Sequence, residues 1–245
     1  MIKGLLARKD SCPMLVGGVN SAAPTDGLSQ SLNNQPPTPG LDRTLPGTPM
    51  LPLTLRSTDV VLVRHGETAW SRSGQHTGST DIPLTPAGEL AARALAPFLE
   101  QLTFARVFCS PLARARRTAE LAGFGTRLEL DADLMEWNYG AYEGRTSAEI
   151  QATTPGWLVF RDGCPDGESP EAVGARVDRV IARLRQGPGP SLVVAHGHLL
   201  RVLAARWLDL PPLAGCHFLL DTTTVSVLSD YRGTPALGCW NAPLN

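Results

Sequence analysis

The sequence contains no long apolar run and no marked excess of charge of either sign. None of its apolar runs approaches the roughly 20 residues that span a bilayer, so no membrane-spanning helix is expected. The chain carries 22 basic and 23 acidic residues, for a net charge of −1. This balance argues against a general electrostatic attraction to nucleic acid or to an anionic membrane. It leaves room for a local basic pocket.

Closely spaced cysteines are also missing. The chain has five cysteines, at positions 12, 109, 164, 216 and 239, and no two of them form a CxxC pair. This spacing excludes a zinc ribbon and a thioredoxin-type motif, and a disulfide framework is not expected in a chain of this size. The first residues, MIKGLLARKD, lack the long apolar stretch and cleavage site of a secretory leader. We therefore expect reduced thiols and a cytoplasmic protein.

Proline divides the chain into two parts. Residues 1–57 are rich in proline, glycine, serine, asparagine and threonine and show no sustained apolar periodicity. Such a segment buries too little apolar surface to offset the entropy lost on ordering. We expect a disordered N-terminal extension over residues 1–57, with a start-site artefact as the alternative, followed by one catalytic domain over residues 58–245.

Strand and helix patterns alternate through this second part. Short apolar runs predict buried strands, and apolar residues at helical spacing predict helices. The expected strands are residues 59–63, 106–109, 128–130, 191–195, 218–220 and 225–228, and the expected helices are residues 86–99 with a kink at Pro97, 112–122, 170–185 and 199–207. Alternation of this kind predicts an α/β sandwich with a mainly parallel sheet, in which ligands bind beyond the carboxyl ends of the strands.

Charged and imidazole side chains follow these strands directly. Arg64 and His65 come after the first strand, Ser110 follows the second, and Arg114 lies one turn into the next helix. His196 follows the strand at 191–195. Since parallel strands end at one edge of a sheet, we expect these side chains to converge.

Two arginines beside an uncharged imidazole are suited to holding a phosphoryl group. A guanidinium group donates paired hydrogen bonds to phosphate oxygens and stays charged. A histidine kept neutral by nearby cations can attack phosphorus through a ring nitrogen. The leaving oxygen then needs a proton, and Glu136, after the third expected strand, is the best candidate donor.

A series of motifs around these residues resembles the histidine phosphatase superfamily, the family of phosphoglycerate mutases and related phosphatases. RHGE alone is only suggestive, but the whole series is specific. The resemblance covers roughly residues 59–229 in the family's order. The matching motifs are VRHGET at 63–68, TG at 77–78, LTPAG at 84–88, SPLARA at 110–115, TA at 118–119, Glu136, YG at 139–140, EG at 143–144, GES at 167–169 and HG at 196–197.

The resemblance implies a fold, a mechanism and a set of site residues. The fold is a three-layer α/β/α sandwich, and the chemistry needs no metal and no cofactor. His65 matches the family's phosphorylated nucleophile, and Glu136 matches the proton donor. Arg64, Arg114 and His196 match the rest of the phosphate pocket.

The family contains both phosphatases and mutases. Mutases carry a long insertion between the proton donor and the second histidine, whereas only 60 positions separate Glu136 from His196 here. The mutase pattern also has asparagine where this chain has Ser71. The loop from Trp70 to Pro83 is more similar to sedoheptulose-bisphosphatase-like enzymes and bacterial acid phosphatases, and so is His198 with the residues after it.

We therefore expect a metal-independent phosphomonoesterase that acts through a phosphohistidine on small phosphate esters such as sugar phosphates. A cofactor-dependent phosphoglycerate mutase and a catalytically inactive phospho-ligand binding module remain the alternatives. The expected substrate contacts, besides Arg64, Arg114 and Glu136, are Ser71, Gln75, Thr77, Gly78 and His198.

Three assignments stay open. His198 either touches substrate or caps the helix that follows it. His76 either faces substrate or lies in a solvated loop. The oligomeric state is not readable, because an apolar face that buries a core and one that buries a partner look alike in sequence.

Overall fold

The computed structural model describes residues 54–244. The extension expected over residues 1–57 therefore lies outside the described residues, apart from its last four positions. The boundary expected at residue 58 stays a prediction.

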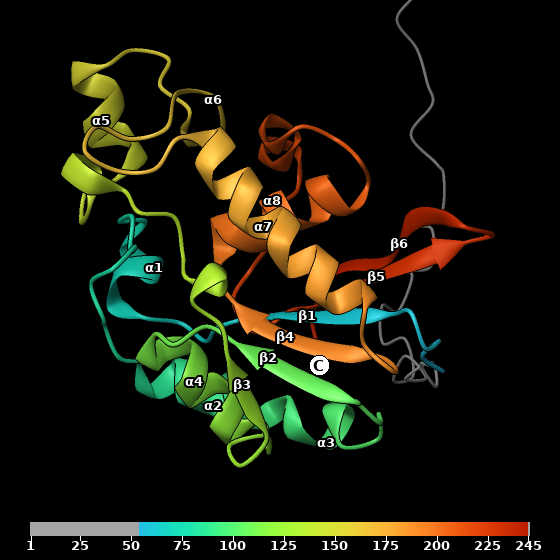
Figure 1. Ribbon diagram of the computed structural model, residues 1–245. Helices are drawn as coiled ribbons and strands as arrows, with labels where there is room; N and C mark the ends of the chain where they lie inside the picture. Colours follow the sequence, from blue (N-terminus) through green and yellow to red (C-terminus); the bar gives the residue numbers. More distant parts are fainter. Residues whose placement is uncertain (1–53, 245) are drawn as a thin grey trace, which may run out of the picture. The chain divides into compact units, whose positions relative to one another are not determined.

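A six-stranded sheet with the order β3-β2-β4-β1-β5-β6 forms the centre of this region (Figure 1). The strands β1, β2, β3 and β4 run parallel, and β5 and β6 run antiparallel at one edge. The strands are β1 Val60–Arg64, β2 Arg106–Cys109, β3 Leu128–Leu130, β4 Ser191–Ala195, β5 Val225–Tyr231 and β6 Thr234–Ala242. The prediction of a mainly parallel sheet is confirmed.

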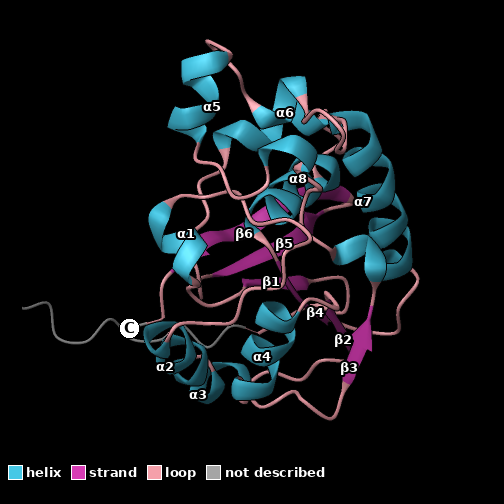
Figure 2. Cartoon of the chain, turned by 90° about the vertical axis from the view of Figure 1, so that its left-hand side faces the viewer, coloured by secondary structure: helices cyan, strands magenta, loops and turns pink. Residues whose placement is uncertain are grey.

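Helices cover both faces of the sheet (Figure 2). Helices α2, α3 and α4 lie on one face, and α7 and α8 lie on the other. The helices are α1 Ala69–Ser73, α2 Pro86–Ala94, α3 Ala96–Leu99, α4 Ala113–Leu121, α5 Ser147–Thr153, α6 Val159–Asp162, α7 Pro170–Arg185 and α8 Gly197–Trp207, and the 3-10 helices are η1 Ala132–Leu134, η2 Gly140–Tyr142 and η3 Pro212–His217. This arrangement is the expected α/β/α sandwich.

The apolar strands are buried because each contributes to two cores. Val60 and Leu62 of β1 pack with α7 and α8, whereas Val61 and Val63 pack with α2, α3 and α4. All four side chains are at most 2% exposed. A central parallel strand therefore reads as a continuous apolar run.

The first expected helix breaks where proline predicted a kink. Thr85 caps the start of α2, with its hydroxyl accepting a hydrogen bond from the amide of Gly88. Helix α2 ends at Ala94, and Pro97 lies in the first turn of α3.

The strand expected at residues 218–220 is not formed. The carbonyl groups of this segment bind side chains instead of a neighbouring strand: Leu219 accepts from the Trp240 indole and Leu220 accepts from the Arg64 guanidinium. Strand β6 was not predicted, because it lies at an edge, contains Pro235 and shows no clean alternation of buried residues.

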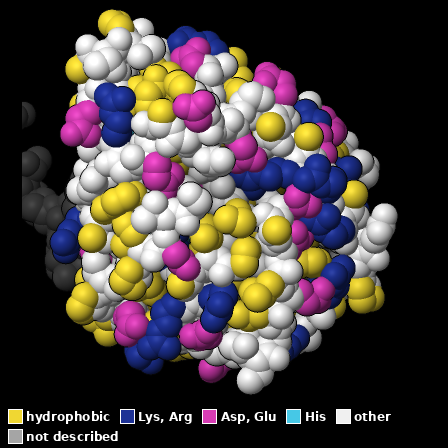
Figure 3. Space-filling model, turned by 60° about the vertical axis from the view of Figure 1, so that its left-hand side comes forward, with side chains coloured by type: hydrophobic (Ala, Val, Ile, Leu, Met, Phe, Trp, Pro, Cys, Tyr) yellow, Lys and Arg dark blue, Asp and Glu magenta, His cyan; other side chains and the backbone are white. Residues whose placement is uncertain are grey.

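The surface shown in Figure 3 carries basic and acidic side chains beside one another. Several form exposed ion pairs, such as Arg117 with Glu89 and Arg206 with Asp178. In residues 54–244 no helix has the length and apolar character needed to cross a membrane.

Candidate active site

The predicted reactive side chains meet where β1, β2 and β4 end, on the side of the sheet toward which the arrowheads of β2 and β4 point in Figure 1. The imidazole rings of His65 and His196 lie with their centres 5.1 Å apart. Arg64, His65 and Glu136 line a cavity of about 230 Å³. The other lining residues are Ser71, Gly74, Gln75, His76, Thr77, Tyr139, Ser147, Gly197, His198, Arg201 and Leu220.

The ring of His65 is buried and held in one tautomer. Its Nδ1 lies 2.7 Å from the carbonyl oxygen of Gly66. Because a carbonyl only accepts, Nδ1 carries the proton and Nε2 keeps its lone pair. Burial, reinforced by the charges of Arg64 and Arg114, lowers the pKa of His65 well below its usual value. A neutral imidazole with a free Nε2 is a nucleophile at neutral pH.

Arg64 lines the same cavity as His65, and one N–H group of its guanidinium has no partner in the described part of the chain. Its Nη1 donates to the carbonyl of Leu220, while its Nε is buried and has no hydrogen-bond partner among the described residues. Gly197 permits this close approach, since a Cβ atom there would lie 3.2 Å from the guanidinium carbon. The Nε–H is thus available to an oxygen of a bound anion.

Arg114 is fully buried and connects the second histidine to a loop. Its Nε donates to Nδ1 of His196 at 3.2 Å, and its Nη2 donates to the carbonyl groups of Thr77 and Gly78 at 3.0 and 2.9 Å. His196 then carries its proton on Nε2, which lies 2.7 Å from the Ser110 hydroxyl. Burial, with Arg114 next, lowers the pKa of His196 well below its usual value. Arg114 and His196 therefore stand behind the cavity lining rather than in it.

The carboxylate of Glu136 sits against the first turn of α8. One oxygen accepts from the backbone amide of Leu199 at 2.9 Å and from that of Trp137 at 3.0 Å. The other accepts from the amide of His198 at 3.1 Å. Free amides and the helix dipole make a helix N-terminus a favourable place for a carboxylate.

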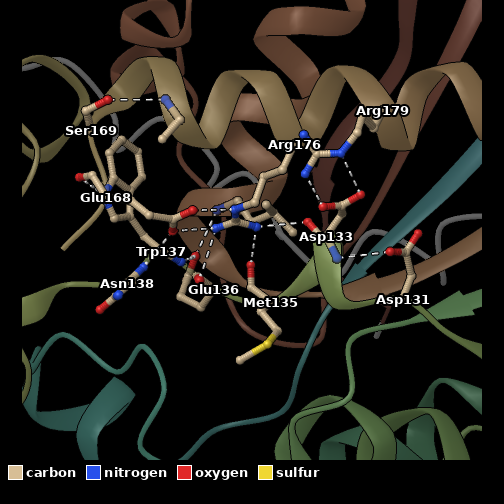
Figure 4. A network of polar contacts seen from close by, with 12 residues as sticks. Asp131, Asp133, Met135, Glu136, Trp137, Asn138, Glu168, Ser169, Arg176 and Arg179 are labelled. Atoms are coloured by element: carbon tan, nitrogen blue, oxygen red, sulfur yellow. Dashed lines mark hydrogen bonds and ion pairs between the residues drawn. The ribbon is translucent and has the colours of Figure 1, made fainter.

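Arg176 of α7 holds the loop that carries Glu136 (Figure 4). Its guanidinium donates to the backbone carbonyl groups of Asp133, Met135 and Glu136 at 2.8, 2.6 and 3.1 Å. It also pairs with the carboxylate of Glu168 at 2.8 and 3.0 Å. Arg176 was not predicted, because an arginine within an amphipathic helix gives no local signal of such a role.

The expected substrate contacts have mixed outcomes. Ser71 and Thr77 line the cavity, and so does Gln75, whose amide also donates to the carbonyl of Gly144 at 2.7 Å. Gly78 lies behind the lining, where a Cβ atom would come within 2.6 Å of Glu143 and of a backbone carbonyl.

His198 lines the cavity and does not cap helix α8. The cap position belongs to His196, and Nδ1 of His198 lies 2.5 Å from the Tyr139 hydroxyl. His76 is also a cavity residue: its side chain packs on Tyr139 and Trp157 with ring centres 4.7 and 5.4 Å away. The alternative of a solvated loop is therefore wrong for His76. Arg201, Ser147 and Leu220 were not predicted. Tertiary contacts bring Ser147 and Leu220 here, whereas Arg201 lies about one helical turn after His198 in α8.

A second cavity, of about 570 Å³, lies at the other end of β1, near Ser57 and Trp207. The predicted site residues do not line it.

Known proteins similar to this chain carry phosphatase and mutase names. The family model described as histidine phosphatase superfamily (branch 1) matches residues 60–243. An acid phosphatase of Mycobacterium tuberculosis is 38% identical over 187 residues, which cover 75% of this chain and 92% of that protein. Sedoheptulose 1,7-bisphosphatase of Saccharomyces cerevisiae is 36% identical over 202 residues, covering 69% and 74%.

Two further matches bear on fold and activity. A probable phosphoglycerate mutase of Enterobacter sp. is 35% identical over 189 residues, covering 73% of this chain and 87% of that protein. A solved structure of an open reading frame product from Mycobacterium tuberculosis has a TM-score of 0.73 and 37% identity, and the match covers 76% of this chain and 98% of that one.

Replacing Arg176 tests the network in Figure 4. Arg176→Met removes the charged partner of the partly buried Glu168, which keeps only the amide of Asn138 as a donor among the described residues, and removes the Arg176 donors of three carbonyl groups. We expect the free energy of unfolding to fall by about 3–5 kcal/mol. Arg179→Met is the matched control, because Arg179 also pairs with a carboxylate but its side chain is 58% exposed; it should cost less than about 1 kcal/mol. Equal losses in denaturant unfolding would contradict this account.

His76 predicts a dependence of stability on pH. Burial lowers its pKa to about 4 in the folded chain, from an ordinary value of 6.5. Between these values the unfolded chain binds a proton that the native chain excludes, so the free energy of unfolding falls as the pH falls from about 6.5 to about 4. His76→Gln should remove about one proton from this slope, measured as urea-unfolding free energies at several pH values. If His76→Gln leaves the pH dependence of the free energy of unfolding unchanged, the lowered pKa of His76 is refuted.

Proposed function

The chain belongs to branch 1 of the histidine phosphatase superfamily, and on that premise we propose that it hydrolyses small phosphate monoesters through a phosphohistidine at His65. The observation that carries the proposal is the state of this ring. It is neutral, its Nδ1 proton is engaged by Gly66, and its Nε2 is free beside the guanidinium of Arg64.

The proposed first step transfers the phosphoryl group to the protein. Nε2 of His65 attacks phosphorus in line with the leaving oxygen, the bond from phosphorus to that oxygen breaks, and Glu136 supplies the proton that turns the leaving alkoxide into an alcohol. In the second step, Glu136 takes a proton from water as the water oxygen attacks phosphorus. The phosphorus–nitrogen bond breaks, which releases inorganic phosphate and restores neutral His65.

Arginine charge supports both displacements in this proposal. Arg64 offers its unpaired Nε–H to a phosphoryl oxygen. Arg114 and His196 act from behind the lining, with Arg114 holding His196 in the tautomer whose proton lies on Nε2. Fixed charges of this kind, already in place before the reaction, stabilise the transition state of phosphoryl transfer. The proposed chemistry therefore needs no metal ion.

Small metabolites are the proposed substrates. The cavity of about 230 Å³ is smaller than the typical ligand site of roughly 300–1,000 Å³, which favours a small substrate. Hydroxyl, amide and imidazole groups in the lining suit a hydroxylated substrate such as a sugar phosphate. Two relatives are named acid phosphatase and sedoheptulose 1,7-bisphosphatase.

A phosphoglycerate mutase is the second candidate, because another relative is named a probable enzyme of that type. Against it stands the compact segment between Glu136 and His196. Besides strand β4, that segment holds only the short helices η2, α5 and α6 and the longer helix α7. An open site admits water, and water favours hydrolysis over transfer to a second hydroxyl group.

Phosphate release decides between these candidates. We expect the wild-type chain to release phosphate from p-nitrophenyl phosphate and from sugar phosphates in the presence of EDTA. His65→Ala should reduce kcat by about 10³-fold or more, whereas His217→Ala, which changes an exposed histidine outside the cavity, should have little effect.

The result also separates the alternatives. Exchange between 2- and 3-phosphoglycerate without net release would favour the mutase. Rapid quenching and mass spectrometry would detect phosphorylation of His65. Binding of esters without any such phosphorylation would favour an inactive binding module. Full activity in His65→Ala would refute the phosphohistidine mechanism.

The role of Glu136 gives a leaving-group test. Glu136→Gln should slow phosphorylation of His65 by sugar phosphates by about 10²–10⁴-fold. The loss should be much smaller with p-nitrophenyl phosphate, because p-nitrophenolate leaves without protonation. Single-turnover rates with both esters measure the difference, and equal losses would contradict the assignment of Glu136 as proton donor.

A further inference from the structure

Thr118 of the TA motif lies in helix α4 and is fully buried, outside the lining of the cavity. Its hydroxyl oxygen accepts a hydrogen bond from the backbone amide of Gly66 at 2.9 Å, and its O–H donates to the backbone carbonyl of Arg114 at 2.7 Å. The first of these contacts joins segments that are 52 residues apart in the sequence. Thr118 therefore connects helix α4 to the residue that follows His65.

The hydrogen bond to Arg114 sets the direction of the hydroxyl group. A threonine within a helix commonly donates to the carbonyl group four residues earlier, so this contact alone is ordinary. Because it uses the single proton of the hydroxyl, the oxygen keeps only acceptor positions for other partners. The amide of Gly66 occupies one of them. The Thr118 hydroxyl is therefore oriented by its own helix to accept from Gly66.

Gly66 is the residue that keeps the proton of His65 on Nδ1. Its carbonyl oxygen lies 2.7 Å from Nδ1, and the hydrogen bond made by one ring nitrogen decides which nitrogen is protonated. A glycine is required at this position, because a Cβ atom would lie 2.6 Å from the carbonyl oxygen of Gly88. The tautomer of His65 thus depends on the backbone conformation of a glycine.

The wide conformational range of glycine means that this carbonyl group needs restraints from outside the residue. Backbone contacts hold the chain on either side: the amide of His65 donates to a carbonyl of β4 at 3.0 Å, and the carbonyl of Glu67 accepts from the amide of Thr85 at 2.8 Å. At Gly66 itself, the amide is held by the side chain of Thr118. The loss of that hydroxyl would leave a buried amide without its acceptor at the position that orients His65.

We propose that Thr118 is a positioning residue for the reaction: by holding the amide of Gly66, it fixes the carbonyl group that keeps the His65 proton on Nδ1 and leaves Nε2 free. The inference rests on the proposed function, because the free Nε2 is the nucleophile of that reaction. Arg114 lies one turn earlier in the same helix. Helix α4 therefore supports both the phosphate pocket and the nucleophile.

Nuclear magnetic resonance of the full chain with ¹⁵N-labelled histidine tests the tautomer without turnover, since protonated and unprotonated ring nitrogens differ in chemical shift. The signals of His65 are those that disappear in His65→Ala. In the wild-type chain at neutral pH we expect the proton on Nδ1. Thr118→Val keeps the shape of the side chain and removes the hydroxyl, so a measurable fraction of His65 should then carry its proton on Nε2.

Single-turnover phosphorylation by p-nitrophenyl phosphate measures the effect on the reaction. Thr118→Val should lower the maximal rate by roughly ten- to hundredfold, as for a buried amide that loses its partner. The half-saturating concentration of the ester should change much less, because the arginine side chains that bind the phosphoryl group are kept. Thr118→Ser retains the hydroxyl, and it should retain the wild-type tautomer and most of the rate.

Ser226→Ala is the matched control. Ser226 is also fully buried, and its hydroxyl oxygen accepts from the backbone amide of Asn241 at 2.9 Å, but it lies in β5 outside the lining of the cavity. Its removal also leaves a backbone amide without its acceptor, so the chain should lose stability as in Thr118→Val. The tautomer of His65 and the rate of phosphorylation should stay unchanged.

Three outcomes would overturn the proposal: an unchanged tautomer in Thr118→Val, an unchanged rate in that variant, or the same changes in Ser226→Ala. If Thr118→Val does not fold, hydrogen exchange of the Gly66 amide in the wild-type chain decides. Slow exchange is expected, and exchange as fast as that of an exposed loop amide would contradict the contact. A changed tautomer in Thr118→Val, together with no phosphate release from any ester by the wild-type chain, would support the role of Thr118 in orienting His65 while contradicting the proposed hydrolysis.

Discussion

Uncompensated arginine charge is the constraint around which the site is arranged. Arg64, Arg114 and Arg201 are each held by neutral acceptors, namely backbone carbonyl groups and one imidazole, rather than by carboxylates. Elsewhere Arg176 has its carboxylate partner in Glu168. Burial, reinforced by the charges of Arg64 and Arg114, keeps the imidazole of His65 neutral. A nucleophile and arginine groups that attract an anion therefore lie in one site.

Loops, more than the sheet, orient the arginine side chains of the site. Strands β1 and β4 deliver His65 and His196 to one edge, but carbonyl groups of irregular segments orient the guanidinium groups. The segment 77–80 holds Arg114, and the segment 215–220 holds both Arg64 and Arg201. Residues 218–220 lie outside the sheet despite their apolar sequence, and the carbonyl groups of Leu219 and Leu220 accept hydrogen bonds from the side chains of Trp240 and Arg64.

This division explains what the sequence could and could not predict. The central strands and the convergence of His65 with His196 followed from local patterns, because apolar runs and the edge of a parallel sheet are properties of short segments. Arg176 was beyond such reasoning, since its partner lies in a distant segment: 40 residues separate Arg176 from the Glu136 carbonyl. Edge strand β6 was missed because its burial pattern is irregular.

The hydrogen bond from Nδ1 of His65 to Gly66 has a consequence for the chemical identity of the proposed intermediate. Phosphohistidine exists as two isomers, and the engaged Nδ1 leaves only Nε2 to carry the phosphoryl group. The intermediate would therefore be the Nε2-linked isomer. An isomer-selective antibody raised against that linkage would recognise the trapped protein, and one raised against the Nδ1-linked isomer would not.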